Sequence, residues 1–516
     1  MAEYTVTDNI RWRIEDGTLM IEPDKDGAMI DYVQNNICFS PWYAQRDKIT
    51  DVEILDGITK IGAGAFYDCY KLQRISISNT VESVGFQAFH NCSMLKVLTF
   101  PESVKTIGDY AFTFCASLTR VEFRTQEPIS VGKCVFETFA GSENIITIDG
   151  LGVDSTVFDE GNIGANAKIT FETDGKDGNI RWAISGGNLR LTMSKDYSDE
   201  YKPYVKDNVC SAPWHKYRTG IHRATLNDGF KEINCGMFFD CVYLTDVKIP
   251  PTIEVIGMQA FHNCRSLKSL TVPQQVRIIF DYAFTFCTSL EILYMLPEKP
   301  PMLGKHLFDT VPGAKIITIK GQDWINYEYF NDETIGDNAK ISFDVFGYME
   351  SLEWRIENGV LTIRGIAGSN MQMDIMVVDN KCIAPWHKYA SGIHHIVIEP
   401  GMLNIGAGAF YDCPYAEDIQ IPSTITDVGY QAFHNCKKLH NITFPANLRT
   451  IGDYEFTFCT SLKSIYFMSD SSPYFGIGIF DGIPEDQEIT IYTIGWKPQN
   501  ASIQSYPMIK FAKIGE

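Results

Sequence analysis

The sequence predicts a right-handed α/β solenoid built as three tandem modules, each beginning with a β-hairpin. Three observations lead to this fold class. The chain repeats every 172 residues, each repeat opens with two alternating strand patterns around a two-residue turn, and the rest of each repeat has a 23-residue period. We expect the modules to span residues 1–174, 175–346 and 347–516. Since three times 172 is 516, no separate catalytic domain fits in the chain.

Composition and charge indicate a folded protein and limit its partners. Apolar residues make up 45% of the chain and charged residues 21%, close to globular averages. The 44 Lys and Arg against 64 Asp and Glu give a formal net charge of −20, and no basic run occurs. Nucleic-acid affinity depends on clustered positive charge, so we expect no nucleic-acid partner, and anionic membrane surfaces are disfavoured for the same reason.

No stretch of the chain has the roughly 18 apolar residues that a membrane helix needs. We therefore expect no membrane insertion. The first residues, MAEYTVTDNIRW, do not have the pattern of a secretory signal. An extracellular or cell-surface location would thus require an export signal that this sequence lacks, and a cytoplasmic location is the alternative.

The long repeat is clearest in a shared C-x-x-P-W element, whose members are 172 residues apart: Cys38, Cys210, Cys382, Trp42, Trp214 and Trp386. Upstream of it, each module has two alternating segments joined by Asp-Gly, Gly-Gly or Asn-Gly, which favour the type I′ turn of a hairpin. One tryptophan alternates in phase with the apolar residues of each hairpin: Trp12, Trp182 and Trp354. We favour a core role for these tryptophans over a platform for stacking sugars.

The 23-residue rows follow the template L-x-x-I-x-I-P-x-x-V-x-x-I-G-x-x-A-F-x-x-C. Its first part predicts a short strand, and the I-G pair predicts a turn in which glycine has positive φ. The A-F-x-x-C part places Phe and Cys on one face of a single helical turn. One strand plus one helical turn in 20 to 29 residues is typical of leucine-rich-repeat solenoids, in which stacked rows share a core.

These rows resemble the BspA-like leucine-rich repeats over residues 49–117, 222–289 and 394–461, where glycine, Ala-Phe and Cys recur in fixed register. The hairpins, the P-W element and the segments that close each module are similar to that family as well. The resemblance implies a secreted or surface-displayed bacterial protein that binds host proteins or other cell surfaces. It provides no catalytic residues.

Nine cysteines end the rows in threes spaced 23 residues apart: Cys69, Cys92, Cys115, Cys241, Cys264, Cys287, Cys413, Cys436 and Cys459. Stacked rows keep equivalent side chains roughly parallel, which suits a disulfide poorly. We expect buried thiols that act as small apolar residues. A disulfide from Cys38, Cys210 or Cys382 to the neighbouring row stays open.

Histidine recurs in the A-F-H-N-C segments at His90, His262 and His434. Structural zinc needs four ligands, commonly in closely spaced pairs, and these rows do not offer such a set. We expect solvated loop residues and no metal. No G-x-S-x-G elbow, P-loop, H-E-x-x-H or dinucleotide-binding turn occurs, so we expect neither catalytic residues nor a cofactor.

The second and third x of L-x-x-I-x-I should line the exposed face of the sheet. In the first three rows these positions hold small or mixed residues, such as Arg74 with Ser76 and Val97 with Thr99. The fourth rows have larger groups, and aromatic and Arg residues often anchor interfaces. The candidate partner-binding residues are Arg120, Arg124, Tyr294 and Tyr466. The alternative is that these residues pack against the closing segment of their own module.

Three functions fit these observations. The first is a non-enzymatic binding or adhesion protein at the cell surface, which recognises a protein on another cell through repeated sheet faces. The second is a glycan-binding or glycan-active surface protein, which would need two carboxylates in an aromatic cleft if it were an enzyme. The third is an intracellular leucine-rich-repeat scaffold.

Overall fold

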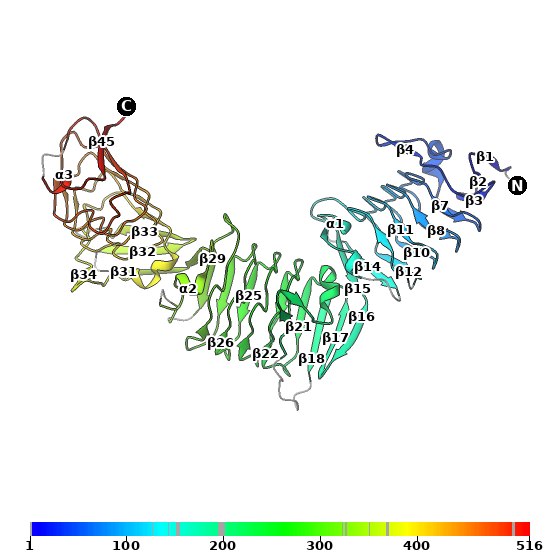
Figure 1. The fold of residues 1–516 in the computed structure, drawn as a ribbon, viewed down its shortest axis with the longest axis horizontal. Coiled ribbons are helices and arrows are strands. Elements are labelled where there is room, and N and C mark those ends of the chain that lie inside the picture. Colours follow the sequence, from blue (N-terminus) through cyan, green and yellow to red (C-terminus); the bar gives the residue numbers. More distant parts are fainter. Residues whose placement is uncertain are drawn as a thin grey trace. The chain divides into compact units, whose positions relative to one another are not determined.

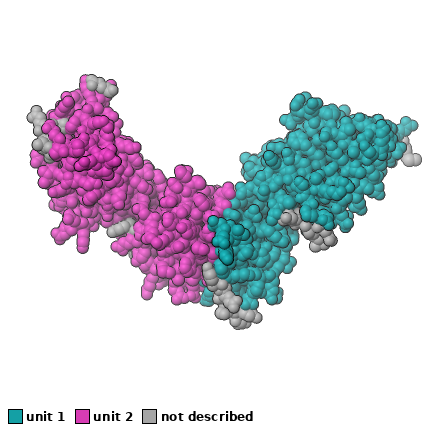
Figure 2. Space-filling view, viewed as in Figure 1, with its two compact units in different colours: residues 1–231, 236–250 teal, residues 232–235, 251–516 magenta. Residues whose placement is uncertain are grey.

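The computed structural model describes residues 3–125, 127–142, 144–150, 155–193, 202–321, 324–325, 328–349, 351–367, 371–497 and 501–515. Over these residues the chain is a β-solenoid of stacked rows with little helix (Figure 1). It divides into two compact units, residues 1–231 with 236–250 and residues 232–235 with 251–516 (Figure 2). This division falls inside the second module, so the module boundaries remain a prediction.

The predicted hairpins are confirmed in all three modules. Both residues of each turn have left-handed backbone, with φ from 48° to 81°, as a type I′ turn requires: Asp16, Gly17, Gly186, Gly187, Asn358 and Gly359. A further antiparallel strand precedes each pair. The strands are β1 (Thr5–Thr7), β2 (Ile10–Glu15) and β3 (Thr18–Pro23), then β16 (Thr173–Asp177), β17 (Ile180–Ser185) and β18 (Asn188–Met193), then β31 (Val345–Met349), β32 (Leu352–Glu357) and β33 (Val360–Gly365).

The L-x-x-I-x-I segments form parallel sheets, which we call the exposed sheets. Each hairpin continues directly into one of them, because β3, β18 and β33 pair in parallel with the first row. The strands of the first module are β6 (Asp51–Ile54), β8 (Arg74–Ile77), β10 (Val97–Phe100), β12 (Arg120–Phe123), β14 (Ile145–Gly150) and β15 (Lys168–Phe171). Those of the second are β21 (Arg223–Leu226), β23 (Asp246–Lys248), β25 (Ser269–Val272), β27 (Ile292–Met295), β29 (Ile317–Gly321) and β30 (Ile341–Phe343). Those of the third are β36 (His395–Ile398), β38 (Asp418–Gln420), β40 (Asn441–Phe444), β42 (Ser464–Phe467), β44 (Ile489–Thr493) and β45 (Ile509–Lys513).

A second parallel sheet, which the sequence analysis did not predict, forms at the V-x-x-I segment, which precedes glycine in most rows. Its strands have two residues each and stack in register from row to row. They are β7 (Lys60–Ile61), β9 (Ser83–Val84), β11 (Thr106–Ile107), β13 (Ser130–Val131), β22 (Glu232–Ile233), β24 (Val255–Ile256), β26 (Ile278–Ile279), β28 (Met302–Leu303), β37 (Asn404–Ile405), β39 (Asp427–Val428), β41 (Thr450–Ile451) and β43 (Tyr474–Phe475).

The predicted helical turn in each row is wrong. The A-F-x-x-C segments are hydrogen-bonded turns, in which Cys69 N donates to Phe66 O at 3.2 Å. The residue before the cysteine, such as Asp68 with φ of 58°, is left-handed, so a right-handed helix cannot continue through it. The helices lie elsewhere: 3₁₀ helices η1 (Tyr43–Lys48), η2 (Ser155–Val157), η3 (His215–Gly220) and η4 (His387–Gly392), and short helices α1 (Glu160–Ile163), α2 (Asp332–Ile335) and α3 (Ala501–Gln504).

The glycine of the I-G pair also differs from expectation, because its φ is not positive in the repeated rows. Close packing of successive rows explains it instead. A Cβ added at Gly85 would lie 2.4 Å from Ala63 N, and one added at Gly429 would lie 2.4 Å from Ala407 N. Glycine is therefore needed here for space and not for backbone conformation.

Stacked phenylalanines fill the core between the two sheets. In the first module Phe66, Phe89, Phe112 and Phe136 follow one another with ring centroids 5.1 to 5.7 Å apart and nearly parallel planes. Each is at most 2% exposed. Offset stacking of this kind adds to the burial free energy, so it helps fix the register between rows.

The P-W tryptophans begin this core. Trp42 is fully buried, and its Nε1–H donates to Ala65 O at 2.8 Å; Trp386 makes the same bond to Ala409 O at 2.8 Å. Trp12 packs edge-on against Trp42 at 5.8 Å. The hairpin tryptophans Trp12, Trp182 and Trp354 are 5 to 8% exposed, which confirms their core role. Short hairpins precede the P-W element: β4 (Val33–Gln34) with β5 (Ile37–Cys38), β19 (Val205–Lys206) with β20 (Val209–Cys210), and β34 (Val377–Val378) with β35 (Lys381–Cys382).

The repeats that we predict as modules follow one another without a linker. Strand β15 ends at Phe171 and β16 begins at Thr173, so Glu172 alone separates the last strand of one module from the first strand of the next. Asp344 has the same place between β30 and β31. The chain therefore passes from one module to the next within a nearly continuous extended segment.

Polar contacts repeat at both junctions. At the first, Thr170 Oγ1 accepts a hydrogen bond from Gly187 N at 2.7 Å, and His222 Nε2 lies 2.6 Å from Ile169 O. The second junction has the equivalent contacts, from Gly359 N to Ser342 Oγ at 2.6 Å and between His394 Nε2 and Ile341 O at 2.8 Å. Burial lowers the pKa of both histidines, and of His394 to about 4. Each imidazole is thus neutral at pH 7 and acts as a fixed structural group.

Candidate binding surface

The alternation predicted for the exposed sheet is confirmed by burial. In β12, Val121 and Phe123 face the core and are at most 2% exposed, whereas Arg120 and Glu122 face outward. The same pattern holds in β10, β25, β40 and β42. The outward positions of these strands form the candidate binding surface.

Arg120 lies within a network of charges on this surface. It forms ion pairs with Glu122 at 2.9 Å and with Asp149 on the closing strand β14. Arg124 follows β12 and is exposed. The closing segment therefore engages Arg120, as our alternative interpretation expected, while Arg124 stays accessible.

Tyr294 lies on β27 and is 38% exposed. Beside it the same sheet has a hollow of about 470 Å³, lined in part by Ile292, Thr318 and Lys320. Lys320 forms an ion pair with Asp344 at 3.0 Å, so charge at the edge of the hollow is partly neutralised. Tyr294 does not line the hollow itself and stands opposite Lys320 on the neighbouring strand β29.

Tyr466, on β42, stacks against Tyr492 of the closing strand β44, with ring centroids 4.6 Å apart and planes 7° from parallel. The sequence analysis missed Tyr492. It stands two residues after Thr490 in ITIYT, where the other modules have Asp149 and Lys320. This difference between the modules is the signal that could have revealed it.

The structure does not bring the four candidates into one site. Arg120 and Arg124 belong to the first compact unit, whereas Tyr294 and Tyr466 belong to the second and lie on different sheets. Their assignment as partner-binding residues therefore remains a prediction, made separately for each module.

The cysteines that end the rows are buried, and many of their thiols donate to the row before. Cys92 Sγ lies 3.2 Å from Phe66 O, and Cys436 Sγ lies 3.3 Å from Phe410 O. The structure contains all fourteen cysteines as thiols. Burial raises the pKa of Cys92 and Cys436 well above the usual value. A thiol in this position completes the polar contacts of the turn and is chemically unreactive.

Thiol titration should show this burial directly. We expect the native protein to react slowly with a disulfide reagent, except at the half-buried Cys134, Cys210 and Cys382, because the thiolate is the reacting form and burial disfavours it. Burial raises the pKa of Cys382 to about 11, so its reaction should accelerate with pH. After denaturation all 14 thiols should react. Rapid reaction of most thiols in the native protein would contradict this, and a Cys134→Ser variant identifies one of the fast groups.

The repeated histidines are half-buried and stacked on aromatic rings, so the expectation of solvated loop residues holds only in part. His90 lies against Tyr67 with ring centroids 4.5 Å apart and meets Phe114 edge-on at 5.4 Å. His434 has the equivalent neighbours. Burial lowers the pKa of both imidazoles. Within the described ranges, no three His, Cys, Asp or Glu side chains come together in a way that could hold a metal ion.

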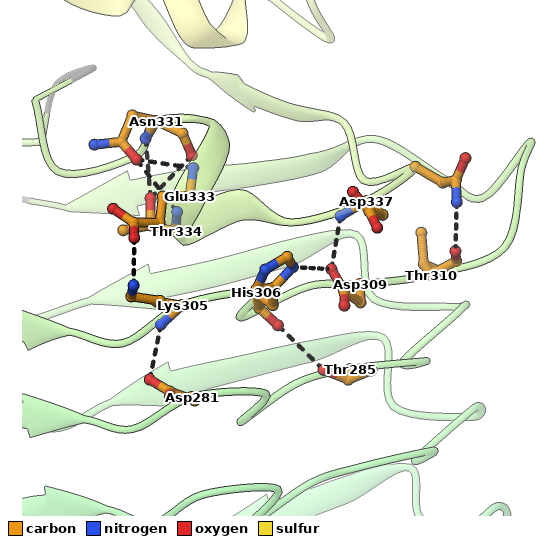
Figure 3. A network of polar contacts seen from close by, with 11 residues as sticks. Asp281, Thr285, Lys305, His306, Asp309, Thr310, Asn331, Glu333, Thr334 and Asp337 are labelled. Carbon is orange, nitrogen blue, oxygen red and sulfur yellow. Dashed lines mark hydrogen bonds and ion pairs between the residues drawn. The ribbon is translucent and has the colours of Figure 1, made fainter.

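A network of hydrogen bonds and ion pairs joins the closing segment of the second module to its last row (Figure 3). His306 Nδ1 lies 3.0 Å from Asp309 Oδ1, and the same oxygen accepts a hydrogen bond from Asp337 N at 2.6 Å. Lys305 pairs with Glu333 at 2.5 Å, within the first turn of α2. Since the Asp309 carboxylate is bound by main chain and the imidazole stacks on Tyr282, the pair fixes the fold and does not resemble a catalytic dyad.

The sequence analysis missed a set of aromatic residues with left-handed backbone. In the third row of the first module, Tyr110 and Phe114 have left-handed φ of 56° and 60°, at positions where the preceding row has Gln87 and Asn91. Large aromatic residues rarely adopt this conformation, which costs on the order of 1 kcal/mol or more. The equivalent residues of the other modules share it: Tyr282, Phe286, Tyr454 and Phe458. The DYAFTFC pattern could have indicated these left-handed aromatic residues, because it places Tyr and Phe where other rows have Gly, Gln, Asp or Asn.

The repeat rows of this chain match those of a known family. Residues 39–161, 216–335 and 387–495 match the BspA type leucine rich repeat region, in six copies. The match covers more than half of the chain and includes the rows described above. The chain belongs to the BspA-type leucine-rich repeat family. The predicted resemblance to this family and the leucine-rich-repeat solenoid are therefore confirmed.

Solved structures similar to this BspA-type chain are leucine-rich repeat proteins. One from Bacteroides ovatus is 18% identical, with 99% of each chain covered and a TM-score of 0.21. One from Eubacterium ventriosum is 18% identical, with 98% of each chain covered and a TM-score of 0.25. The pneumococcal vaccine antigen PcpA is 15% identical over 66% of this chain and 94% of its own, with a TM-score of 0.27. A comparison with curated proteins gives no match.

BspA-type surface proteins are commonly binding or adhesion proteins. In the described part of this BspA-type chain, no helix has the length and apolar character needed to cross a membrane.

Proposed function

We propose that this chain is a non-enzymatic binding protein, extracellular or displayed on a cell surface, that recognises a protein on another cell through its exposed sheets. In this proposal it consists of three tandem modules of a right-handed solenoid, with boundaries near residues 174 and 346. The family supports a binding role, since BspA-type surface proteins commonly bind or adhere.

One observation carries the proposal: the modules share their inward residues and differ in their outward ones. In the fourth row the core positions are apolar and at most 2% exposed in every module, for example Val121, Leu293 and Ile465. The outward pairs are Arg120 with Glu122, Ile292 with Tyr294, and Ser464 with Tyr466. Packing accounts for the shared residues. Packing does not require the outward residues to differ. Their differences give each exposed face its own chemistry, which is what we expect of a surface that recognises partners.

A glycan is the second candidate ligand, favoured by one observation in the third module. The stacked rings of Tyr466 and Tyr492 stand beside Ser464, Thr490 and Asn441, which are opposite one another on neighbouring strands. Aromatic rings next to hydroxyl and amide groups suit a sugar, which has both apolar and polar faces.

The proposal is tested by binding of the full chain to intact cells, measured by flow cytometry. We expect Tyr294→Ala and Tyr466→Ala each to weaken binding, and the double variant to weaken it by much more than either, because linked sites reinforce each other. An interface anchor typically costs at least about 2 kcal/mol, roughly a thirtyfold change in affinity.

A matched control is Thr271→Ala, which removes the outward neighbour opposite Tyr294 on β25. Unchanged binding by a correctly folded double variant would place the site elsewhere and leave packing against the closing segment as the role of Tyr466. Protease treatment of the target cells should abolish binding if the partner is a protein, whereas periodate treatment should do so if it is a glycan.

A further inference from the structure

In all three modules the exposed sheet is interrupted between its second and third rows, since β8 and β10, β23 and β25, and β38 and β40 belong to different hydrogen-bonded sheets. In the first module no backbone hydrogen bond joins β8 and β10, although both lie fully within the described residues. The inward residues of β8, Ile75 and Ile77, are only partly buried, whereas Leu98 and Phe100 of β10 are fully buried.

A hollow of about 560 Å³ opens along this interruption. Ile75, Met94 and Val97 form its apolar floor and walls, with Arg74, Lys96 and Thr99 also lining it. Met94 and Val97 are each 45% exposed. Together these residues form an apolar groove, which we call the β8–β10 groove.

The charges of the groove are positive in a protein of net charge −20. None of its lining residues is acidic. Arg74 pairs with Asp51 at 2.5 Å, whereas the Lys96 ammonium has no ion-pair partner among the described residues. Lys96 therefore offers an uncompensated cation next to apolar surface, which complements a carboxylate close to an apolar side chain.

The other two modules do not repeat this groove. The places of Met94 and Val97 are taken by Ser266 and Ser269 in the second module and by Lys438 and Asn441 in the third. Arg74 is replaced by Asp246 and Asp418. A core requirement would act on all three modules alike, so the apolar and cationic character of the first is not needed for folding.

From the apolar groove and its positive charge, we propose that the first module binds an extended acidic peptide segment of a partner protein, with apolar side chains placed on Met94 and Val97 and a carboxylate at Lys96. Strands β8 and β10 lie too close together for a further strand between them, so side-chain contacts in the groove would supply the affinity. The apolar contacts and the lysine would provide selectivity. This inference rests on the proposed binding function and adds the chemistry of one partner.

The test uses the full chain and two labelled ten-residue peptides, followed by fluorescence anisotropy. One peptide alternates valine with glutamate, and the control alternates valine with lysine. We expect the acidic peptide to bind and the basic one not to bind. The double variant Met94→Ser, Val97→Ser, which introduces the residues of the second module, should lower affinity at least tenfold. Lys96→Gln should lower it severalfold and reduce its dependence on salt.

Lys268→Gln is the matched control, since Lys268 has the place of Lys96 in the second module and should not affect binding. Because Met94, Lys96 and Val97 are surface residues, these variants should keep the wild-type circular dichroism spectrum and melting temperature. Binding of the acidic peptide that is equal in wild type and double variant overturns the inference. Failure of the acidic peptide to bind at millimolar concentration overturns it as well.

These outcomes are separable from those of the cell-binding experiment. If the chain binds cells and the acidic peptide does not bind the groove, the proposed function stands and this inference fails. If the chain binds no cells while the peptide binds the groove in the expected manner, the proposed function fails and the groove remains a peptide site.

Discussion

Replacing Glu455 with alanine is expected to stabilise the protein at neutral and alkaline pH. Glu455 has the place that alanine occupies in the equivalent rows of the other modules, at Ala111 and Ala283. It is fully buried, and its Oε2 accepts only a 3.2 Å hydrogen bond from Ala432 N, while Oε1 has no partner. Desolvation raises the pKa of this carboxyl well above its usual value, so the folded protein holds it protonated.

The sign and size of the effect follow from this raised pKa. In the unfolded chain the carboxyl ionises above about pH 4.3, so while the carboxyl stays protonated in the folded protein each further pH unit costs roughly 1 kcal/mol of stability. This cost is absent below pH 4.3 and grows as the pH rises toward the folded pKa. After allowing for the cavity that alanine leaves, we expect Glu455→Ala to gain about 1 to 3 kcal/mol at pH 8 and little or nothing at pH 4.

Differential scanning calorimetry at pH 4 and pH 8 measures the difference. Glu455→Gln is the matched control, because it keeps the volume of the side chain and removes its ionisation, so it should share the gain at pH 8. If both variants melt at lower temperature than the wild type at pH 8, the buried carboxyl stabilises the fold and the expected cost of its burial is wrong.

Replacing Gly85 with alanine should have the opposite effect and lower the stability of the first compact unit by about 3 kcal/mol. The new Cβ would lie 2.4 Å from Ala63 N and 2.8 Å from the carbonyl carbon of Gly62. These are backbone atoms of the preceding row, so relief requires the rows to move apart, which loosens the phenylalanine stack beneath them. The melting temperature of the unit measures the loss.

Gly161→Ala provides a control in the same module. Gly161 lies in α1 without positive φ, and its nearest neighbour to an added Cβ is the Asp159 carboxylate at 3.4 Å. Alanine there should be neutral or stabilise by about 0.5 kcal/mol, because it restricts the unfolded chain. Equal effects of the two substitutions would show that row spacing does not explain the glycine.

Most of the fold could be predicted because residues that recur in every row must pack against one another in the core. A residue that recurs at one position in every row, such as Phe89 or Cys92, must meet its own copy in the next row, so spacing alone places it in the core. The path between those positions was harder to predict. Two left-handed residues per row, as at Gln87 and Asn91, replace the expected helical turn. Asparagine favours this conformation, but glutamine does not.

The candidate site was less predictable, since it depends on contacts between different parts of a module. The alternation of the strands showed that Arg120 and Tyr466 face outward, but not that Asp149 and Tyr492 of the closing strands would meet them. The interruption between β8 and β10 leaves no distinct mark either. The interruption recurs in all three modules, so Met94 and Val97, where the other modules have polar residues, indicate only the apolar groove of the first module.

The single residue between β15 and β16 has a consequence for how such a chain can lengthen. Because each closing strand runs directly into the next hairpin, and because Thr170 and Ser342 make the same contact at successive junctions, the end of one copy already fits the start of another. Duplication in frame of a 172-residue segment would therefore add a folded copy with its interface already complete. Its outward residues would then be free to diverge, since only the inward and junction residues are held by packing.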